Sequence, residues 1–320
     1  MMQLKLEKLK LVPAVNRELN NKLKGPIWVL FLGEFSMNKL NLFNYDQIKL
    51  NLNITLNKKT FLKIFSSIDS TNDQAKNYLK ELKKKNSGIH DKQIGVFAAD
   101  FQEKGRGRRG HNWFSGGPAG ISVSFLFEAG DNIAQIPLIT AAAALAVNDN
   151  FKDFALKTKI KWPNDILIGN KKIAGILTEL VFNETQSAFV IIGCGINLNN
   201  STFNNKISDF ATSYYLEKGE KINKNIFLAG LINKMQYYIE GYLYGNRNDI
   251  IKSWKKELGL TGKKVDFTYK NNNYTGVIKE ILNNGDLLIE LKNGKTKQLD
   301  SLNTSLNYNS LAKYNDFKKS

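Results

Sequence analysis

A segment rich in glycine and arginine, FQEKGRGRRGHNWF at residues 101–114, lies between two apolar runs of the chain. The run before it, residues 94–100, is IGVFAAD. The run after it, residues 120–128, alternates large apolar residues with smaller or polar ones, which is the period of a half-buried strand. The segment is therefore predicted to be a loop that joins two strands of a folded sheet. A disordered RNA-binding segment and a plain solvated turn are the competing interpretations, and the apolar flanks argue against both.

The residue types of this loop indicate that it binds a ligand. Glycine allows a backbone to take positive φ and to approach a ligand closely. The guanidinium group of arginine offers a planar set of donors that matches phosphate or carboxylate oxygens. Glycines and arginines alternate in the order Gly105, Arg106, Gly107, Arg108, Arg109, Gly110, and Trp113 follows. We expect this loop to close over an anion.

Composition excludes several classes of protein. The 320 residues are 42% hydrophobic, enough for a packed core, and the length predicts about two domains. Cys194 is the single cysteine, so no intramolecular disulfide can form and a reducing compartment is expected. The two histidines, His90 and His111, are too few for a histidine-rich metal site or a zinc module. Neither a transmembrane run of 18 apolar residues nor a secretory signal is present, so a cytoplasmic location is expected.

The net charge of +17 raises the question of nucleic-acid binding. Lysines dominate this charge and are spread among asparagines and isoleucines from end to end. Such a distribution predicts solubility and the steering of acidic partners rather than one basic patch. The charge therefore does not identify a function.

Hydrophobic periodicity and turn residues predict alternating strands and helices, followed by a small β module. The expected helices cover residues 45–50, 72–85, 137–150, 226–241 and 249–258. The expected strands cover residues 59–69, 94–100, 120–128, 157–168 with a break at Pro163, 171–182 and 187–199, and four short strands lie between 264 and 300. The predicted domains are an N-terminal extension (1–39), a catalytic domain (40–258), a β module (259–310) and a polar tail (311–320).

Three further segments are candidates for binding, and each has a plainer interpretation. Ser70-Thr71-Asn72 begins a helix, whose free N–H groups favour an anion, although helix capping alone explains these residues. The KWPND segment, residues 161–165, places Asn164 and Asp165 at a strand end, but a simple turn has the same residues. Lys172, in the segment KKIAG, is by itself an ordinary surface lysine.

Together, the order and spacing of these segments resemble the biotin–protein ligases. The matching segments are STN at 70–72, GRGRRG at 105–110 with Trp113, KWPND at 161–165, KIAGI at 172–176, GCGINLN at 193–199 and ATSY at 211–214. The resemblance covers residues 40–308. It implies an α+β fold in which helices flank a mixed sheet, as in class II synthetases, with a C-terminal SH3-like barrel.

The resemblance also implies a reaction in two steps. Biotin and ATP would form biotinyl-5′-AMP and pyrophosphate, and a lysine of a biotin carboxyl carrier domain would then take the biotin. Mg²⁺ would accompany ATP, with Asp165 as its ligand. A homodimer would be compatible with the exposed sheet edges of such a fold. Neither a membrane nor DNA is an expected partner.

Residue roles follow from the resemblance, position by position. The implied catalytic residues are Lys172, Arg108 and Arg106. The implied biotin-binding residues are Ser70, Thr71, Asn72, Gln102, Gly105, Arg106, Gly107, Arg108, Trp113, Lys172, Gly193 and Gly195. The implied ATP-binding residues are Arg108, Arg109, Trp113, Asn164, Asp165, Lys172 and Asn197.

The chain departs from the family pattern at both ends. The residues before the predicted catalytic domain are too few for a winged helix-turn-helix, so a ligase without a DNA-binding domain is expected, and Met37 is an alternative start. Asn307 stands where the family often has arginine. The alternatives are a lipoate–protein ligase with the same adenylate chemistry, a repressor of biotin synthesis and an RNA-binding protein.

Overall fold

The computed structural model describes residues 43–52, 60–84, 94–114, 117–129, 136–182 and 187–315. The expected N-terminal extension, the alternative start at Met37 and His90 lie outside the described residues.

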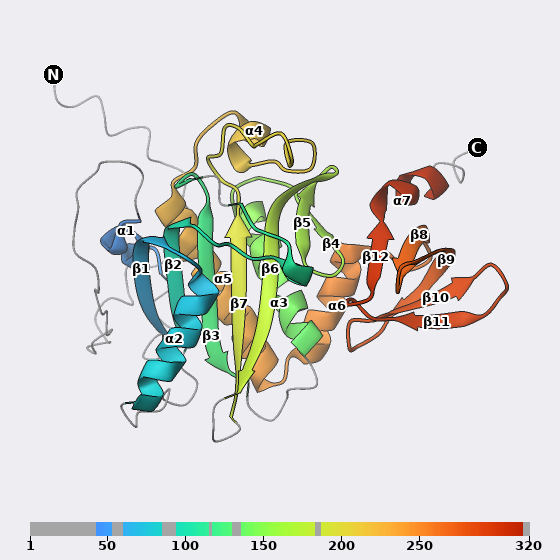
Figure 1. The fold of residues 1–320 in the computed structure, drawn as a ribbon, viewed down its shortest axis with the longest axis horizontal. Helices are drawn as coiled ribbons and strands as arrows, with labels where there is room; N and C mark the ends of the chain where they lie inside the picture. The colour runs from blue at the N-terminus through green and yellow to red at the C-terminus, as the bar shows by residue number, and fades with distance from the viewer. Residues whose placement is uncertain are drawn as a thin grey trace, which may run out of the picture.

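A seven-stranded mixed sheet forms the centre of the molecule (Figure 1). Its strand order is β1-β2-β3-β7-β6-β5-β4, in which β1 and β2 are parallel and every other neighbouring pair is antiparallel. The strands are β1 (Thr60–Ile68), β2 (Ile94–Gln102), β3 (Ile121–Glu128), β4 (Lys159–Lys161), β5 (Asp165–Ile168), β6 (Lys171–Phe182) and β7 (Ala188–Ile196). The predicted mixed sheet is therefore confirmed, and the break at Pro163 separates β4 from β5.

Helices cover both faces of this sheet (Figure 1). Helix α2 (Thr71–Lys84) packs on β2, β3 and β7, while α3 (Ile136–Asp153) packs on the β6 side, with α5 (Lys224–Tyr244) and α6 (Arg247–Leu258) behind it. Two short helices, α1 (Tyr45–Leu50) and α4 (Tyr214–Lys218), complete this part. Asn44 begins α1 by accepting a hydrogen bond from the Gln47 amide, as its short polar side chain favours.

Burial on both faces corrects one prediction, because β3 is not a half-buried strand. All but the last of its residues are buried. Val123, Phe125 and Phe127 lie in the larger core, whereas Leu126 lies in a smaller core with Phe97 and part of α2. The polar residues that alternate with the large ones face α2 rather than solvent.

A second, smaller sheet of five strands follows in the order β11-β10-β9-β8-β12, with all pairs antiparallel. Its strands are β8 (Lys264–Tyr269), β9 (Asn272–Ile281), β10 (Leu287–Leu291), β11 (Thr296–Leu299) and β12 (Thr304–Asn307), and helix α7 (Tyr308–Asn315) comes after them. The sheet is open, with β11 and β12 at its edges, so a closed barrel is not observed. Strand β12 and helix α7 were not predicted, and α7 crosses the expected boundary at residue 310.

Trp162 attaches the smaller sheet to the larger one. Its indole N–H donates to the Gly285 carbonyl at 2.9 Å, and its backbone N–H donates to the Tyr308 hydroxyl at 2.7 Å. Buried apolar residues of the smaller sheet, among them Ile278 and Leu287, continue the larger core. The two sheets are therefore packed as one body around a shared core.

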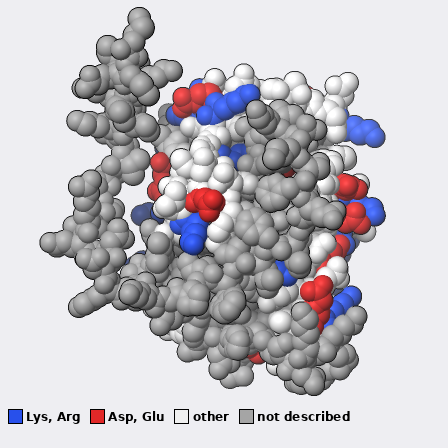
Figure 2. Space-filling model, turned by 90° about the vertical axis from the view of Figure 1, so that its left-hand side faces the viewer, with Lys and Arg blue, Asp and Glu red and all other residues white. Residues whose placement is uncertain are grey.

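Charge is mixed on the face seen from the side of α1 and β1. Among the described residues of this face, Lys and Arg side chains are interspersed with Asp and Glu (Figure 2). No helix in the described part of the chain is both long and apolar enough to span a membrane.

Candidate functional site

A cavity opens on the α2 side of the larger sheet, with about 490 Å³ of empty space that includes its opening to solvent. Segments far apart in the sequence form its walls: the start of α2, the arginine loop, and parts of β3, β6 and β7. The lining residues are Ser70, Thr71, Asn72, Gln102, Arg106, Gly107, Arg108, Trp113, Ser122, Asn164, Lys172, Gly175, Ile176, Leu177, Gly193, Cys194 and Gly195.

Glycines on the two central strands form the floor of the cavity. A Cβ on Gly193 would meet the Asn72 amide, and one on Gly195 would meet the indole ring of Trp113. Gly175, the β6 partner of Gly195, lies against the side chain of Lys172. The floor therefore runs along β7 from the start of α2 to the lysine.

One end of this floor is lined by uncharged polar groups. The Oε1 atom of Gln102 accepts from the Thr71 backbone N–H at 2.9 Å and lies 3.2 Å from the Thr71 hydroxyl. Ser124 on β3 pairs with Gly193 of the floor. Its hydroxyl lies 2.7 Å from the Thr71 hydroxyl and 2.5 Å from Asn72 Oδ1. Ser70 caps α2 through the Asp73 N–H. This end suits a neutral ligand group with both donors and acceptors.

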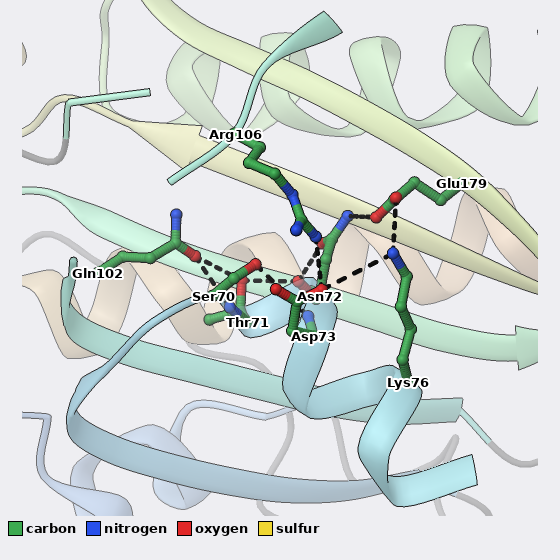
Figure 3. Close-up of polar contacts among 9 residues, drawn as sticks. Ser70, Thr71, Asn72, Asp73, Lys76, Gln102, Arg106 and Glu179 are labelled. Atoms are coloured by element: carbon green, nitrogen blue, oxygen red, sulfur yellow. Dashed lines mark hydrogen bonds and ion pairs between the residues drawn. The ribbon is translucent and has the colours of Figure 1, made fainter. Parts of the chain in front are cut away.

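Two carboxylates form hydrogen bonds to residues at the polar end (Figure 3). Glu179 on β6 accepts from Asn72 Nδ2 at 2.6 Å and from Lys76 Nζ at 2.7 Å. Asp73 in the first turn of α2 accepts from Arg106 at 2.5 Å. This hydrogen bond to Asp73 raises the pKa of the Arg106 guanidinium. Arg106 is thus held across the start of the helix.

The arginine loop folds back on itself as a small hairpin. The Gly107 N–H donates to the His111 carbonyl at 2.6 Å, and the Trp113 N–H donates to the Gly105 carbonyl at 2.9 Å. Arg109 takes a left-handed conformation, with φ of 55°. The predicted ligand loop is therefore ordered and fixed at its base by main-chain bonds.

Arg108 and Arg109 reach from this loop to the smaller sheet. Arg108 donates to Asn164 Oδ1 at 3.1 Å and to the Ser301 carbonyl at 2.7 Å. Arg109 donates to the carbonyls of Ser301 and Thr304 at 3.2 and 2.8 Å. Burial lowers the pKa of Arg108, and the neighbouring Arg109 charge lowers it further, yet an arginine remains charged in proteins. Two cations are thereby gathered where the two sheets meet.

Lys172 lies at the opposite end of the cavity from Thr71. Its ammonium is 2.6 Å from Asp165 and 5.5 Å from the centroid of the Trp113 ring. Its backbone is fixed on both sides, since its N–H donates to the Phe210 carbonyl and its carbonyl accepts from Thr212. With Arg108, this lysine makes its end of the cavity cationic, while Arg106 is bound to Asp73 at the start of α2.

The structure brings most of the predicted site residues together at the cavity. Four of them are not in its lining: Gly105, Arg109, Asp165 and Asn197. Gly105 packs under Trp113, and Asp165 pairs with Lys172. Asn197 instead holds the next loop, because its amide donates to the Thr212 carbonyl at 3.0 Å.

Several residues at or next to the site were not predicted: the lining residues Gly175, Ile176, Leu177 and Cys194, and the polar residues Asp73, Ser122, Ser124, Glu179 and Ser301. Ser122 is 3% exposed, lines the cavity, and its hydroxyl has no hydrogen-bond partner in the described part of the chain. The pair of serines on β3 could have been noticed as polar residues in an apolar strand. Asp73, Glu179 and Ser301 had no signal, because their partners are distant in sequence.

At the cationic end, the carboxylate that the described residues place beside Lys172 is Asp165. No cluster of three or more potential metal ligands exists among the described residues. Magnesium is commonly held by one or two carboxylates together with substrate phosphates. Asp165 fits that pattern only if a phosphate group supplies further oxygens and Lys172 gives up its ion pair. Its role as a metal ligand stays a prediction.

Cys194 contributes to the cavity wall without being reactive. Burial raises the pKa of its thiol to about 12, so the thiol is neutral at physiological pH. The thiolate is the nucleophilic form of cysteine. The chemistry of the cavity therefore depends on its cations and hydrogen-bonding groups.

Comparisons with known proteins agree on one family. The sequence profile of the Biotin/lipoate A/B protein ligase family matches residues 64–197. The bifunctional ligase/repressor BirA of Bacillus subtilis is 33% identical over 205 residues, which are 63% of this chain and 63% of that protein. BirA of Escherichia coli is 26% identical over 224 residues, or 70% of this chain and 67% of that protein.

A solved structure extends this similarity to the fold. The biotin protein ligase from Aquifex aeolicus, in complex with biotin and ATP, superposes with a TM-score of 0.62 and 25% identity. The superposition covers 77% of this chain and 98% of that structure.

Proposed function

From the premise that residues 64–197 are a domain of the Biotin/lipoate A/B protein ligase family, we propose that this chain is a biotin–protein ligase. It activates biotin with ATP and transfers it to a lysine of a biotin carboxyl carrier domain. This chain spans 63% of the length of the B. subtilis relative, so its activity, substrates and partners are our proposals. One observation carries them: a single cavity has uncharged hydrogen-bonding groups at one end and cations at the other.

The polar end fits the ureido group of biotin. That group presents two N–H donors and one carbonyl acceptor, and the cavity offers Thr71 and Gln102 in return. Ser70 adds a hydroxyl at the same end. The glycine floor leaves room for the fused rings, and Trp113 forms an aromatic wall beside it. We assign the expected biotin-binding residues to this end and the floor.

The cationic end fits the reacting groups. In the first step, a carboxylate oxygen of biotin bonds to the α-phosphorus of ATP. The bond between the α- and β-phosphates breaks, and pyrophosphate leaves with the bonding electrons. Two anions must approach each other, so fixed positive charge is the main requirement. Lys172, Arg106 and Arg108 provide it, with Lys172 placed between the carboxyl and the α-phosphate.

All three cations are bound to protein groups in this structure. Asp73 holds Arg106, Ser301 holds Arg108, and Asp165 holds Lys172. We infer that substrate phosphate and carboxylate replace these partners on binding. A magnesium ion bound with ATP would neutralise phosphate charge, and Asp165 would then be available to it. Arg109, Asn164 and Asn197 complete the proposed nucleotide site.

In the second step, the acceptor lysine amine bonds to the carbonyl carbon of the adenylate after losing a proton, and AMP leaves. Closure of the arginine loop would exclude water from this anhydride. The open C-terminal sheet, which we propose to be an SH3-like module, holds that loop through Ser301. We propose a cytoplasmic enzyme, consistent with one buried cysteine.

Lipoate–protein ligation is the second candidate, since the matching family includes both chemistries. The dithiolane ring of lipoate has no N–H donor. A cavity end lined by Thr71, Asn72 and Gln102 would leave its polar groups unsatisfied against such a ring, which is costly in a buried site. The polar end therefore favours biotin.

Transfer of biotin to a carrier domain tests the complete proposal. The purified chain, ATP, biotin and an excess of an isolated biotin carboxyl carrier domain should give a carrier whose target lysine carries biotin in amide linkage. Mass spectrometry of the carrier identifies the modified lysine. A carrier that stays unmodified with biotin but gains lipoate would replace the proposal with the sister activity.

A further inference from the structure

Glu179 does not line the cavity, but it accepts a hydrogen bond from Asn72, which lines the polar end. Its side chain is 26% exposed, and its two oxygens are divided between Asn72 Nδ2 and Lys76 Nζ. An ionised carboxylate can only accept hydrogen bonds. The Asn72 amide must therefore point its NH₂ group at Glu179 (Figure 3). Its oxygen then points away from Glu179, toward Ser124.

This orientation determines the proton of Ser124. The Ser124 hydroxyl lies within hydrogen-bond distance of both Asn72 Oδ1 and Thr71 Oγ1. A hydroxyl has one proton, and an amide oxygen cannot donate. The Ser124 proton therefore goes to Asn72. The oxygen of Ser124 is then left to accept the proton of Thr71 at 2.7 Å, a shorter contact than the 3.2 Å from the Thr71 hydroxyl to its second acceptor, Gln102 Oε1.

The chain of hydrogen bonds ends at the cavity wall. With its proton directed to Ser124, Thr71 presents oxygen lone pairs to the cavity that it lines. It becomes an acceptor, which is what an N–H of the ligand requires. Thr71 and Ser124 are on different elements, and Asn72 and Glu179 are 107 residues apart, so only the folded chain sets this pattern.

We propose that Glu179 is a positioning residue for substrate recognition: through Asn72 and Ser124 it fixes Thr71 as the acceptor for a urea N–H. The proposal rests on the proposed biotin ligase function and adds to it the origin of the donor–acceptor pattern. A site arranged to bond a substrate N–H rejects analogues that lack it much more strongly than an apolar pocket can.

Lys76 provides the means of testing this. Lys76 lies 2.7 Å from the Glu179 carboxylate and 3.7 Å from Asp73 Oδ1, so in Glu179→Gln it takes the nearer Gln oxygen as its acceptor and leaves the Gln NH₂ group facing Asn72. Asn72 must then turn its oxygen to position 179, which reverses the proton order through Ser124 to Thr71. In the double variant Lys76→Met/Glu179→Gln, no cation competes, so the Gln oxygen can return to Asn72 and the original order is restored.

The experiment measures the KM for biotin and the KM for ATP in pyrophosphate exchange, together with thermal unfolding, for four proteins. These are the wild type, Glu179→Gln, Lys76→Met and the double variant. We expect Glu179→Gln to raise the KM for biotin about tenfold or more, as misdirected buried hydrogen bonds do, while the KM for ATP stays unchanged. Lys76→Met should behave as wild type, and the double variant should recover most of the affinity for biotin.

The outcomes separate this inference from the proposed function. A wild type without biotin-dependent exchange overturns the function and, with it, this inference. An active wild type with an unchanged KM in Glu179→Gln overturns the inference alone. A double variant as impaired as Glu179→Gln, or a Lys76→Met as impaired, also overturns it, because the ion pair itself would then be what matters. If Glu179→Gln does not fold, the double variant Lys76→Met/Glu179→Gln decides the question. Recovery of folding and of the KM for biotin in the double variant supports the inference, and no recovery overturns it.

Discussion

The guanidinium of Arg108 donates a 2.7 Å hydrogen bond to the backbone carbonyl of Ser301, 193 residues further along the chain. The same guanidinium donates to Asn164, at the edge of the cavity. One side chain thus connects the arginine loop, the larger sheet and the smaller, C-terminal sheet. The C-terminal module is in this way a structural part of the proposed active site.

The first prediction concerns this junction. Arg108→Lys keeps a positive charge but loses the planar group that serves Asn164 and Ser301 together, so adenylate formation should fall by about a hundredfold. Arg109→Lys is the comparison variant, since the hydrogen bonds of Arg109 to described residues go to backbone carbonyls outside the cavity lining. It should reduce the rate much less. An Arg108→Lys as active as wild type in pyrophosphate exchange would show that charge alone is needed at position 108, and equal losses in the two variants would show that the contacts of Arg108 to Asn164 and Ser301 are not special.

Lys172 is predicted to be essential for activation. Lys172→Ala should abolish biotin-dependent pyrophosphate exchange, because the carboxylate and phosphate would meet without a cation between them. The neighbouring Lys171 is exposed and provides the control: Lys171→Ala should be fully active. Thermal unfolding should be alike in both variants. Normal exchange in Lys172→Ala would refute the assigned role.

A methyl group at Gly195 is predicted to close the floor of the cavity. Its Cβ would coincide with the Trp113 indole, so Gly195→Ala should displace that ring, raise the KM for biotin and lower stability by about 1–3 kcal/mol. In Gly107→Ala the nearest atom to the new Cβ would be the His111 carbonyl oxygen at 3.4 Å, so its stability should be retained. Calorimetric melting of the two variants makes the comparison, and a Gly195→Ala as stable as wild type would contradict it.

The pair of Asp100 and Lys224 is predicted to govern stability away from the site. Both side chains are 3% exposed and their charged atoms are 2.9 Å apart. Lys224→Met leaves a buried unpaired carboxylate and should cost about 3–5 kcal/mol at neutral pH. Burial raises the pKa of Asp100, and losing the lysine removes an influence that lowers it.

The pH dependence of the stability of Lys224→Met follows from the raised pKa of Asp100. A folded-state pKa above the unfolded one means that the folded protein holds the proton more tightly. The free energy of unfolding of Lys224→Met should therefore be greatest in acid and fall as the pH rises through the raised pKa. Urea unfolding at about pH 4 and about pH 8 checks this. The double variant Asp100→Asn/Lys224→Met has no charge at this buried pair, so its free energy of unfolding should depend much less on pH. If Lys224→Met loses the same free energy of unfolding at both pH values, this account is contradicted.

Much of the architecture could be predicted from periodicity. Helix α1 and strand β6 begin and end at the predicted residues, because each has clear turn residues beside it. Strand β12 was missed because TSLN is too short for a periodic pattern, and α7 because it begins directly after that strand. The half-buried interpretation of β3 failed since a strand covered on both faces can still alternate large and small residues.

The site could be predicted only as a set of segments. The order of the motifs that resemble the family indicates that Thr71, Arg108 and Lys172 belong to one site. No local pattern shows that Glu179 contacts Asn72 or that Ser301 contacts Arg108. Glu179 in a strand is typical of a solvent-facing position. Its contact with Asn72 depends on sheet register and on where α2 begins, which are properties of the whole fold.

Biotin-dependent exchange between ATP and pyrophosphate, with lipoate as the parallel substrate, tests the central claim most directly. The assay needs only the first step and no acceptor protein. We predict exchange with biotin and none with lipoate, since the polar end of the cavity requires N–H donors. Exchange with lipoate alone, or with neither substrate, would contradict the claim that this cavity activates biotin.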